Sequence, residues 1–410
     1  MKNCIIAQSG GPTVAINASL AGVMEANKRD KYFDNIYGSV NGILGILDGK
    51  VVNLTDIEKS TPGFVEKLKL TPAMYLGSCR FKLPEPSEEE GIYDRIFAYF
   101  EEKEIDTFFY IGGNDSMDTI LRLSQHARRI RSSVKFIGIP KTIDNDLCGT
   151  DHTPGFGSAA KYIATSILEM AHDTMIYPVK SVTIIEIMGR DAGWLTASSV
   201  LARNEYSLAP HLIYLPERPF SIEGFLADVE AQLEQRNNVM VAVSEGIRDK
   251  DGNYISASEA AADGFGHSQL SGTGKVLEQI ISDRLKIKAR SVEVNILQRC
   301  AAHLSSLTDL DESAAQGAKA HALAQEGHSG IMVTIKRISD KPYTIEAGYA
   351  KIDKVANQVK SVPDKWISAA GNDVTKEMVE YLSPLIQGEP EVEYKDGLPQ
   401  YLFRTYYRKA

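Results

Sequence analysis

The residues of this chain best suited to chemistry are two carboxylates, Asp144 and Asp146, which follow a short apolar run ending at Pro140. The run, residues 134–140, contains β-branched side chains and predicts a buried strand. Side chains two apart in an extended segment point the same way, so both carboxylates are expected in one cleft at a strand's carboxyl end. With Lys141 beside them they suit phosphoryl transfer, which needs a base, a metal ligand and a cation for phosphate oxygens. The alternative is a polar loop containing an Asx-turn.

A glycine pair near the N-terminus predicts a place for an anion. Residues 2–8 are expected to form a strand, Gly10 and Gly11 a turn, and residues 13–26 a helix. Free N–H groups and the helix dipole at such a helix start attract anions, although an ordinary βα turn would also use glycine. The dinucleotide fingerprint GxGxxG is missing, which disfavours a nicotinamide cofactor.

The same pattern recurs at residues 107–116, where an expected strand leads into Gly-Gly-Asn114-Asp115 and a helix through about residue 129. Asp115 lies near the helix start, where it could serve only as a cap. The loop before this strand carries two cations, Arg80 and Lys82, which alone indicate no more than a solvated loop.

Strands and helices are expected to alternate along the rest of the chain, which predicts an α/β fold with mostly parallel sheets and helices on both faces. At 410 residues, two interleaved domains are expected. The later strands are expected at 182–187, 211–215, 239–243, 291–297, 330–337 and 343–350, and the later helices at 157–173, 193–203, 221–235, 273–286, 309–326 and 374–387.

Composition narrows the expected surroundings of the protein. The formal net charge is −9 and no long basic run is present, which disfavours nucleic acid or an anionic membrane as a partner. No apolar run approaches the length of a membrane span or a signal peptide. Four scattered cysteines without a CxxC pair indicate reduced thiols and disfavour a zinc site. We therefore expect a cytoplasmic protein.

A second glycine-rich stretch, Gly272-Thr273-Gly274-Lys275, invites comparison with a phosphate-binding loop. It lacks the glycine five residues before Gly274, and Val276 replaces the required Ser or Thr. The sequence therefore does not predict a nucleotide loop here.

Seven of these loops together resemble the phosphofructokinase family, in family order over about the first three quarters of the chain. They are Ser-Gly-Gly-Pro-Thr at 9–13, Gly-Ser-Cys-Arg-Phe at 77–81, Gly-Gly-Asn-Asp-Ser at 112–116, Pro-Lys-Thr-Ile-Asp-Asn-Asp at 140–146, Met-Gly-Arg at 188–190, Ser-Glu-Gly at 244–246 and Gln-Arg at 298–299. The most specific are Thr-Ile-Asp-Asn-Asp and Met-Gly-Arg at this separation. The chain is most similar to the diphosphate-dependent branch.

The resemblance implies two Rossmann-like domains with the active site in the cleft between them. It implies Mg²⁺-dependent, reversible phosphoryl transfer from diphosphate to the 1-hydroxyl of fructose 6-phosphate, a reaction of glycolysis and gluconeogenesis. The implied residues are Asp144 as base with Lys141, Asp115 and Arg190 at the reacting groups; Thr142, Ile143, Asp146, Met188, Gly189, Glu245, Arg290, Ile296 and Arg299 for the sugar phosphate; Gly10, Gly11, Arg80 and Lys82 for diphosphate; and Asn114 and Asp146 for the metal.

Donor choice depends on two positions of the resemblance. ATP-using relatives usually carry Gly-Gly-Asp-Gly and Pro-Gly-Thr, where this chain has Asp115 and Lys141. A carboxylate would repel an α-phosphate, whereas a lysine would neutralise charge on the transferring group. Three positions depart from the family: Asn114 replaces a metal-binding Asp, Ile296 replaces a polar or aromatic sugar contact, and Ser181 replaces an arginine, for which Lys180 is the candidate substitute.

The implied domains are residues 1–150 with about 300–345 for the donor, about 151–299 for the sugar phosphate, and about 346–410 as a C-terminal extension packed on the body. The family's assembly implies a homodimer or homotetramer. The alternatives are an ATP-dependent 6-phosphofructokinase and a non-catalytic regulatory subunit of the same fold. Activity on a related sugar such as sedoheptulose 7-phosphate stays open.

Overall fold

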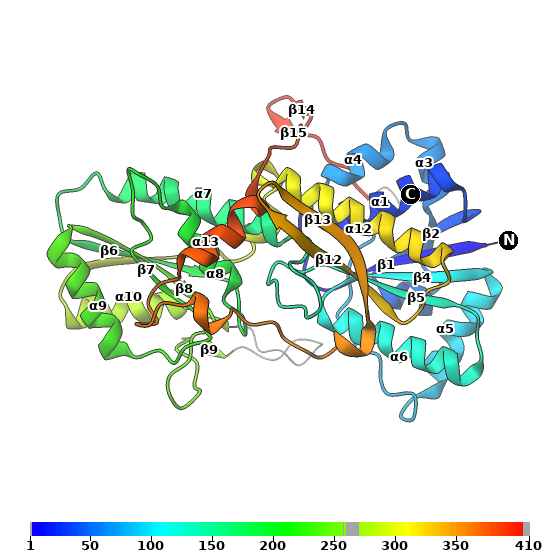
Figure 1. The fold of residues 1–410 in the computed structure, drawn as a ribbon, viewed down its shortest axis with the longest axis horizontal. Helices are drawn as coiled ribbons and strands as arrows, with labels where there is room; N and C mark the ends of the chain where they lie inside the picture. Colours follow the sequence, from blue (N-terminus) through cyan, green and yellow to red (C-terminus); the bar gives the residue numbers. More distant parts are fainter. Residues whose placement is uncertain (1, 257, 260–269, 405–410) are drawn as a thin grey trace.

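A computed structural model describes residues 2–256, 258–259 and 270–404. Two mainly parallel β-sheets lie side by side along the long axis of the molecule, each with its own helices (Figure 1). We call the seven-stranded sheet with its helices the larger half and the four-stranded sheet with its helices the smaller half.

The larger sheet has the strand order β13-β12-β5-β4-β1-β2-β3. The four strands at its centre and their next neighbour β12 run parallel, while β3 and β13 pair antiparallel at the two edges. The strands are β1 (Asn3–Gln8), β2 (Asn35–Ser39), β3 (Val51–Asn53), β4 (Ile105–Gly112), β5 (Lys135–Pro140), β12 (Ile331–Asp340) and β13 (Tyr343–Lys351); the helices are α1 (Ile16–Asp30), α2 (Ile43–Leu47), α3 (Leu54–Ser60), α4 (Phe64–Leu70), α5 (Glu90–Glu102), α6 (Asn114–Ile130) and α12 (Leu307–Gln325).

Alternation of side chains along the strands gives the larger sheet two apolar cores. In β1, Ile6 faces one core with residues of α1 and α12, whereas Ile5 faces the other with residues of α5 and α6. Helices α1 and α12 pack closely, because a Cβ added at Gly22 or Gly317 would fall 2.0 Å from a backbone oxygen of the opposite helix. Both faces of the sheet are thereby covered by helices. The carboxyl ends of the strands therefore remain as the place where ligands can bind.

The smaller sheet is entirely parallel, in the order β11-β6-β8-β7. Helices α7 and α8 share one core with α13, and α9 and α10 share the core on the other face. The elements are β6 (Ser181–Ile187), β7 (Leu212–Tyr214), β8 (Asn238–Ser244), β11 (Lys288–Glu293), α7 (Phe156–Thr174), α8 (Trp194–Ser198), α9 (Ile222–Gln235), α10 (Thr273–Arg284), α11 (Leu297–Cys300) and α13 (Lys376–Leu382), with the short strands β9 (Ser258–Glu259), β10 (Leu270–Ser271), β14 (Tyr394–Lys395) and β15 (Leu398–Pro399) outside both sheets.

The chain after β13 connects the two halves. Ile352 and Val355 belong to a core of the larger half, whereas Val362 and Met378 belong to a core of the smaller half. Farther on, Leu402 packs against the larger half again. The last described part of the chain therefore lies along both halves.

The predicted fold class is confirmed: the chain alternates strands and helices, and most strand pairs are parallel. The strand expected at 291–297 is wrong in its bounds: β11 spans Lys288–Glu293, and the chain turns at Asn295, which has φ 45°. The helix expected at 193–203 is shorter, since α8 ends at Ser198 and a 3₁₀ turn follows.

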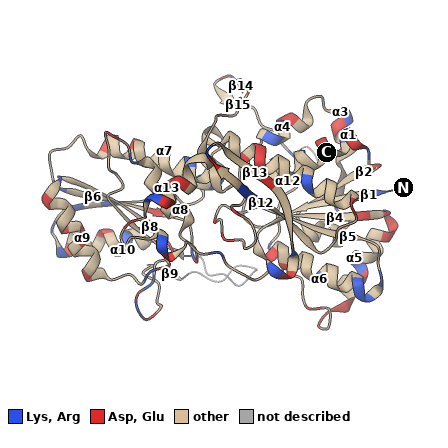
Figure 2. Ribbon diagram, in the orientation of Figure 1, with Lys and Arg blue, Asp and Glu red and all other residues tan. Residues whose placement is uncertain are grey.

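Basic and acidic residues are interspersed over both halves (Figure 2). Within the described ranges, no helix is both long enough and apolar enough to cross a bilayer.

Candidate active site

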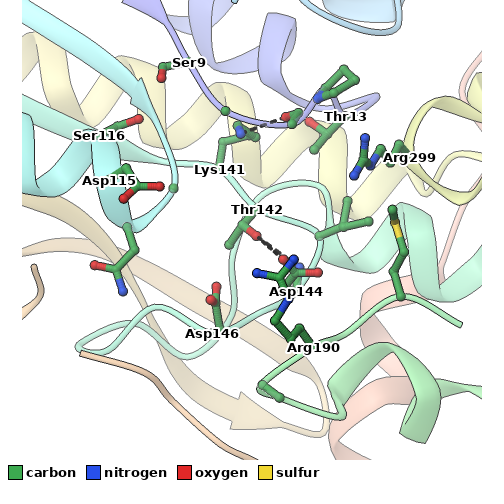
Figure 3. A pocket seen from close by; sticks show the side chains of 18 of the residues that line it. Ser9, Thr13, Asp115, Ser116, Lys141, Thr142, Asp144, Asp146, Arg190 and Arg299 are labelled. Carbon is green, nitrogen blue, oxygen red and sulfur yellow. Dashed lines mark hydrogen bonds between the residues drawn. The ribbon is translucent and has the colours of Figure 1, made fainter. Parts of the chain in front are cut away.

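Five strand ends from both halves meet around one pocket of about 250 Å³ (Figure 3). The loops after β1, β4 and β5 come from the larger half, and those after β6 and β8 come from the smaller half. Four cations and five carboxylates line it: Arg80, Lys141, Arg190 and Arg299, and Asp115, Asp144, Asp146, Asp191 and Glu245. Such a dense mixture of charges suits a highly charged substrate rather than an apolar ligand.

The loop after β5 directs both predicted carboxylates into the pocket. The Asp144 backbone N–H donates to the Thr142 hydroxyl at 3.1 Å, which fixes the turn. Asn145 between them has φ 54°, a left-handed conformation that Asn tolerates. Burial raises the pKa of Asp144, opposed by the positive charges of Arg299 and Lys141. Burial is the main cause that raises the pKa of Asp146 to about 7, and repulsion from Asp144 is the second.

Lys141 connects this loop to the glycine turn after β1. Its side chain is buried, and its ammonium donates to the Gly11 carbonyl oxygen at 2.8 Å. Burial lowers the pKa of Lys141 to about 8, with Asp144 acting in the opposite direction. Gly10 has φ 83°, and a Cβ there would lie only 3.1 Å from the Lys141 nitrogen. Glycine at position 10 therefore leaves room for the lysine beside the predicted anion turn.

Asp115 lies in the first turn of α6 and lines the pocket. The residue that caps this helix is Gly113, so the alternative of Asp115 as the N-cap does not hold. Arg80 approaches from the loop before α5. Burial and the nearby charges of Arg299 and Arg190 lower the pKa of Arg80, while Asp115 raises it. The glycine turn, Lys141, Arg80 and Asp115 thus all line the pocket from the larger half.

The smaller half contributes the loops after β6 and β8. The Gly189 N–H donates to Glu245 Oε1 at 3.4 Å, and the Thr273 hydroxyl donates to the Glu245 carbonyl at 3.1 Å. Burial raises the pKa of Glu245 to about 7. A Cβ at Gly246 would fall 2.0 Å from the Arg190 carbonyl oxygen, so the two loops touch through their backbones. Arg190 and Glu245 thereby line the same pocket as Asp144.

Comparison with known proteins identifies the family of the chain and agrees with its fold. The family model described as Phosphofructokinase matches residues 3–324. The chain belongs to the phosphofructokinase family. It is 40% identical over 401 residues to the pyrophosphate–fructose 6-phosphate 1-phosphotransferase of Halomonas elongata, covering 97% of this chain and 95% of that protein.

Two further relatives of this phosphofructokinase also cover most of the chain. A crystal structure of a pyrophosphate-dependent phosphofructokinase from Marinobacter aquaeolei superposes with a TM-score of 0.86 at 37% identity, covering 98% of this chain and 95% of that one. The sulfofructose kinase of Alkalicoccus urumqiensis is 32% identical over 364 residues, covering 88% of this chain and 91% of that protein.

Fourteen of the family-implied residues line the pocket, and four do not: Lys82, Gly189, Arg290 and Ile296. Gly189 acts through its N–H on Glu245, and Lys82 is exposed. Arg290 lies on the edge strand β11 and forms an ion pair with Asp173 at 3.3 Å. Ile296 is 65% exposed. Residues that sequence reasoning missed are Ser9, Pro12, Thr13, Gly113, Ser116, Asp191 and Ala192. Each of these lies within or directly beside a family motif, which is the signal that could have found it.

Asn114, the departure from the family's metal-binding Asp, uses both ends of its amide. Its Oδ1 accepts from the Asn357 N–H at 2.7 Å, and its Nδ2 donates to the Gln358 carbonyl at 2.8 Å. Among the described residues, no group of three or more His, Cys, Asp or Glu side chains could hold a metal ion. Mg²⁺ nevertheless often binds through one or two carboxylates plus substrate phosphates. The paired Asp144 and Asp146 fit that requirement.

We expect Asn114→Asp to destabilise the protein, because a carboxylate would face the Gln358 carbonyl without a proton to donate. The loss should be about 1 kcal/mol, the usual worth of one hydrogen bond, in urea unfolding with EDTA present. Asn204→Asp is the matched control, since Asn204 Oδ1 only accepts, from the Tyr206 and Ser207 N–H groups. If Asn114→Asp is as stable as the control, the amide is not a clamp on residues 357–358.

Proposed function

We propose that this protein transfers a phosphoryl group from diphosphate to the 1-hydroxyl of fructose 6-phosphate, giving fructose 1,6-bisphosphate and phosphate. The observation that carries the proposal is that the buried Lys141 and the half-buried Asp115 both line the pocket, at the two positions where this chain resembles the diphosphate users of the family.

Asp144 is proposed as the general base. Its pKa is raised by burial, which improves its ability to accept the 1-hydroxyl proton as that oxygen attacks the terminal phosphorus of diphosphate. Lys141 and Arg80 would then stabilise negative charge on the transferring and leaving phosphates. Mg²⁺, held by Asp146 with help from Asn114 or Asp144, would supply further charge neutralisation.

Arg190, Arg299 and Glu245 are proposed to bind fructose 6-phosphate. The guanidinium groups offer forked donors to the 6-phosphate, and the Glu245 carboxyl offers an acceptor to sugar hydroxyls. We further propose residues 1–150 and about 300–345, which make up most of the larger half, as the donor domain and about 151–299 as the sugar-phosphate domain. Residues 346–410 are proposed as an extension on the body.

Asp144→Ser should lower kcat by about 10²–10⁴-fold with little change in either KM, because it removes the proton acceptor and leaves the binding groups. Steady-state kinetics would measure this. Asp353→Ser, at an exposed acid outside the pocket, is the matched control. A near-normal kcat for Asp144→Ser would assign the base to another residue.

Donor choice is the central test of the proposed function. In ATP the α-phosphate would approach Asp115, and two unit charges 4 Å apart repel by about 4 kcal/mol at an effective dielectric of about 20. Wild type should use diphosphate with little ATP activity, Asp115→Gly should gain ATP activity, and Lys141→Gly should mainly lose diphosphate turnover. The ratio of the two activities is measured for wild type, both variants and the double variant. Diphosphate inactivity of folded wild type would reject the proposed function.

A homodimer or tetramer of dimers is proposed, with Arg290 serving the site of a second copy. The supporting observations are that Arg290 lies on an edge strand outside its own pocket, and that Ile296 and Leu297, which follow this strand, are 65% and 63% exposed. Arg290 would then contact the 6-phosphate across the interface.

Arg290→Ala should raise KM for fructose 6-phosphate strongly, and mixing tests whether it acts across an interface. Co-expression of Arg290→Ala with Asp144→Ser should restore about a quarter of wild-type sites, because half the dimers are mixed and each has one complete site. Differently tagged subunits allow the mixed dimers to be purified and assayed. No recovery in purified mixed dimers would place Arg290 in its own subunit's site.

A further inference from the structure

Residues 355–362, which we call the strap, lie behind the loop that carries Asp144 and Asp146. At the larger half, the Asn114 amide clamps the backbone of Asn357 and Gln358, and Asn357 Nδ2 donates to Asp118 at 2.9 Å. The strap thus begins firmly attached to the start of α6.

The middle of the strap pairs with the back of the same loop. The Lys360 N–H donates to the Asp146 carbonyl oxygen at 2.7 Å, and Val359 pairs antiparallel with Leu147. At the smaller half, the Lys360 carbonyl accepts from the Trp194 indole at 2.8 Å, and the Val362 N–H donates to Glu217 at 2.9 Å. One short segment therefore contacts both halves and the loop between them.

The ammonium of Lys360 has three N–H donors and meets three oxygen acceptors. They are Asn145 Oδ1 at 3.1 Å, the Thr150 carbonyl at 3.3 Å and the Asp151 carbonyl at 2.7 Å. The nitrogen also lies 5.1 Å from the Trp194 ring centroid, a cation–π contact. This set leaves the lysine no donor for substrate, so its role is directed at the loop.

Asn145 is the link between the lysine and the carboxylates. It stands between Asp144 and Asp146 in the sequence, but it does not line the pocket that they line. Its amide is held on both sides, by Lys360 and by the Tyr381 hydroxyl, to which its Nδ2 donates at 2.9 Å. Fixing Asn145 at its left-handed φ sets the backbone that aims both neighbours into the pocket.

We infer that Lys360 is a positioning residue, which holds the loop of residues 144–151 so that the Asp144 and Asp146 carboxylates keep their places in the pocket. The inference deepens the proposed function and rests on it for its effect on turnover. Small displacements of a reacting group cost much in rate, while binding groups elsewhere are unaffected. Because Asp146 on the same loop is proposed to bind metal, the signature is a fall in kcat that exceeds the change in either KM.

The test compares Lys360→Met, Tyr381→Phe and Lys354→Met. The first removes all three donors at nearly constant length, and the second removes only the hydroxyl that bonds Asn145 and donates to the Asp151 carbonyl at 2.8 Å. Lys354→Met is the matched control, an exposed lysine six positions before Lys360. Each variant is assayed for kcat and both KM values, for thermal stability, and for amide hydrogen exchange of peptides covering residues 142–152.

Lys360→Met should lower kcat about 10- to 100-fold, a larger change than in either KM, and loop amides should exchange at least about tenfold faster than in Lys354→Met. Tyr381→Phe should also lower kcat and speed loop exchange, but by smaller factors than Lys360→Met. A loss of thermal stability with normal kcat per folded molecule, or with unchanged loop exchange, overturns the inference. If Lys360→Met does not fold, normal kcat and exchange in Tyr381→Phe overturn it.

The two proposals fail in different ways. Inactivity of wild type with diphosphate would reject the proposed function, whereas the exchange rates would still report whether Lys360 orders the loop. If wild type is active, and Lys360→Met is equally active with the same loop exchange rate as wild type, only the positioning role is rejected.

Discussion

The hydrogen bond from the enclosed Lys141 ammonium to the Gly11 carbonyl joins the loops after β5 and β1, two strands separated in the sheet by β4. A cation in an enclosed site is costly unless acceptors or opposite charges compensate it. Here the carbonyl and Asp144 do so, and Lys141 in turn favours the ionised form of Asp144. The geometry of the glycine turn, the charge on the lysine and the basicity of the carboxylate therefore depend on one another.

Helix starts in this chain show how the same local feature can serve different ends. The glycines before α6 leave its first turn open to the pocket, with Asp115 facing it. At α10 the N–H of Gly274 is instead bonded to the buried Glu186 at 2.7 Å. A carboxylate of the chain itself thus occupies the place where a phosphate would bind. That physical reason supports the sequence interpretation that residues 272–275 are not a nucleotide loop.

Local patterns foretold the parts of the site that one segment can specify. The apolar run before Pro140, the glycine pairs and the alternation of strands and helices led to the fold class and to the first candidate residues, because strand ends and helix starts are set by neighbouring residues. The remaining predicted pocket residues came from the family resemblance. Three features could not be predicted in this way. The elements between α1 and β4 have short or mixed patterns, β11 begins three residues earlier than expected at a partly exposed edge, and Lys360 finds its partners only through tertiary contact. Charge alone would have suggested a surface lysine.

The order of strands in the larger sheet has a consequence for synthesis of the chain. Strand β12 pairs with β5, Ile331 lying opposite Ile137, although the whole smaller sheet is encoded between them. During translation the edge of β5 therefore waits for its neighbour until the ribosome has passed residue 340, and α12 must arrive before one core closes. Until then the nascent chain exposes an unpaired strand edge and apolar surface, the features that promote aggregation and recruit chaperones. The interleaved topology thus makes completion of the larger half a late event, because it depends on contacts between residues far apart in the sequence.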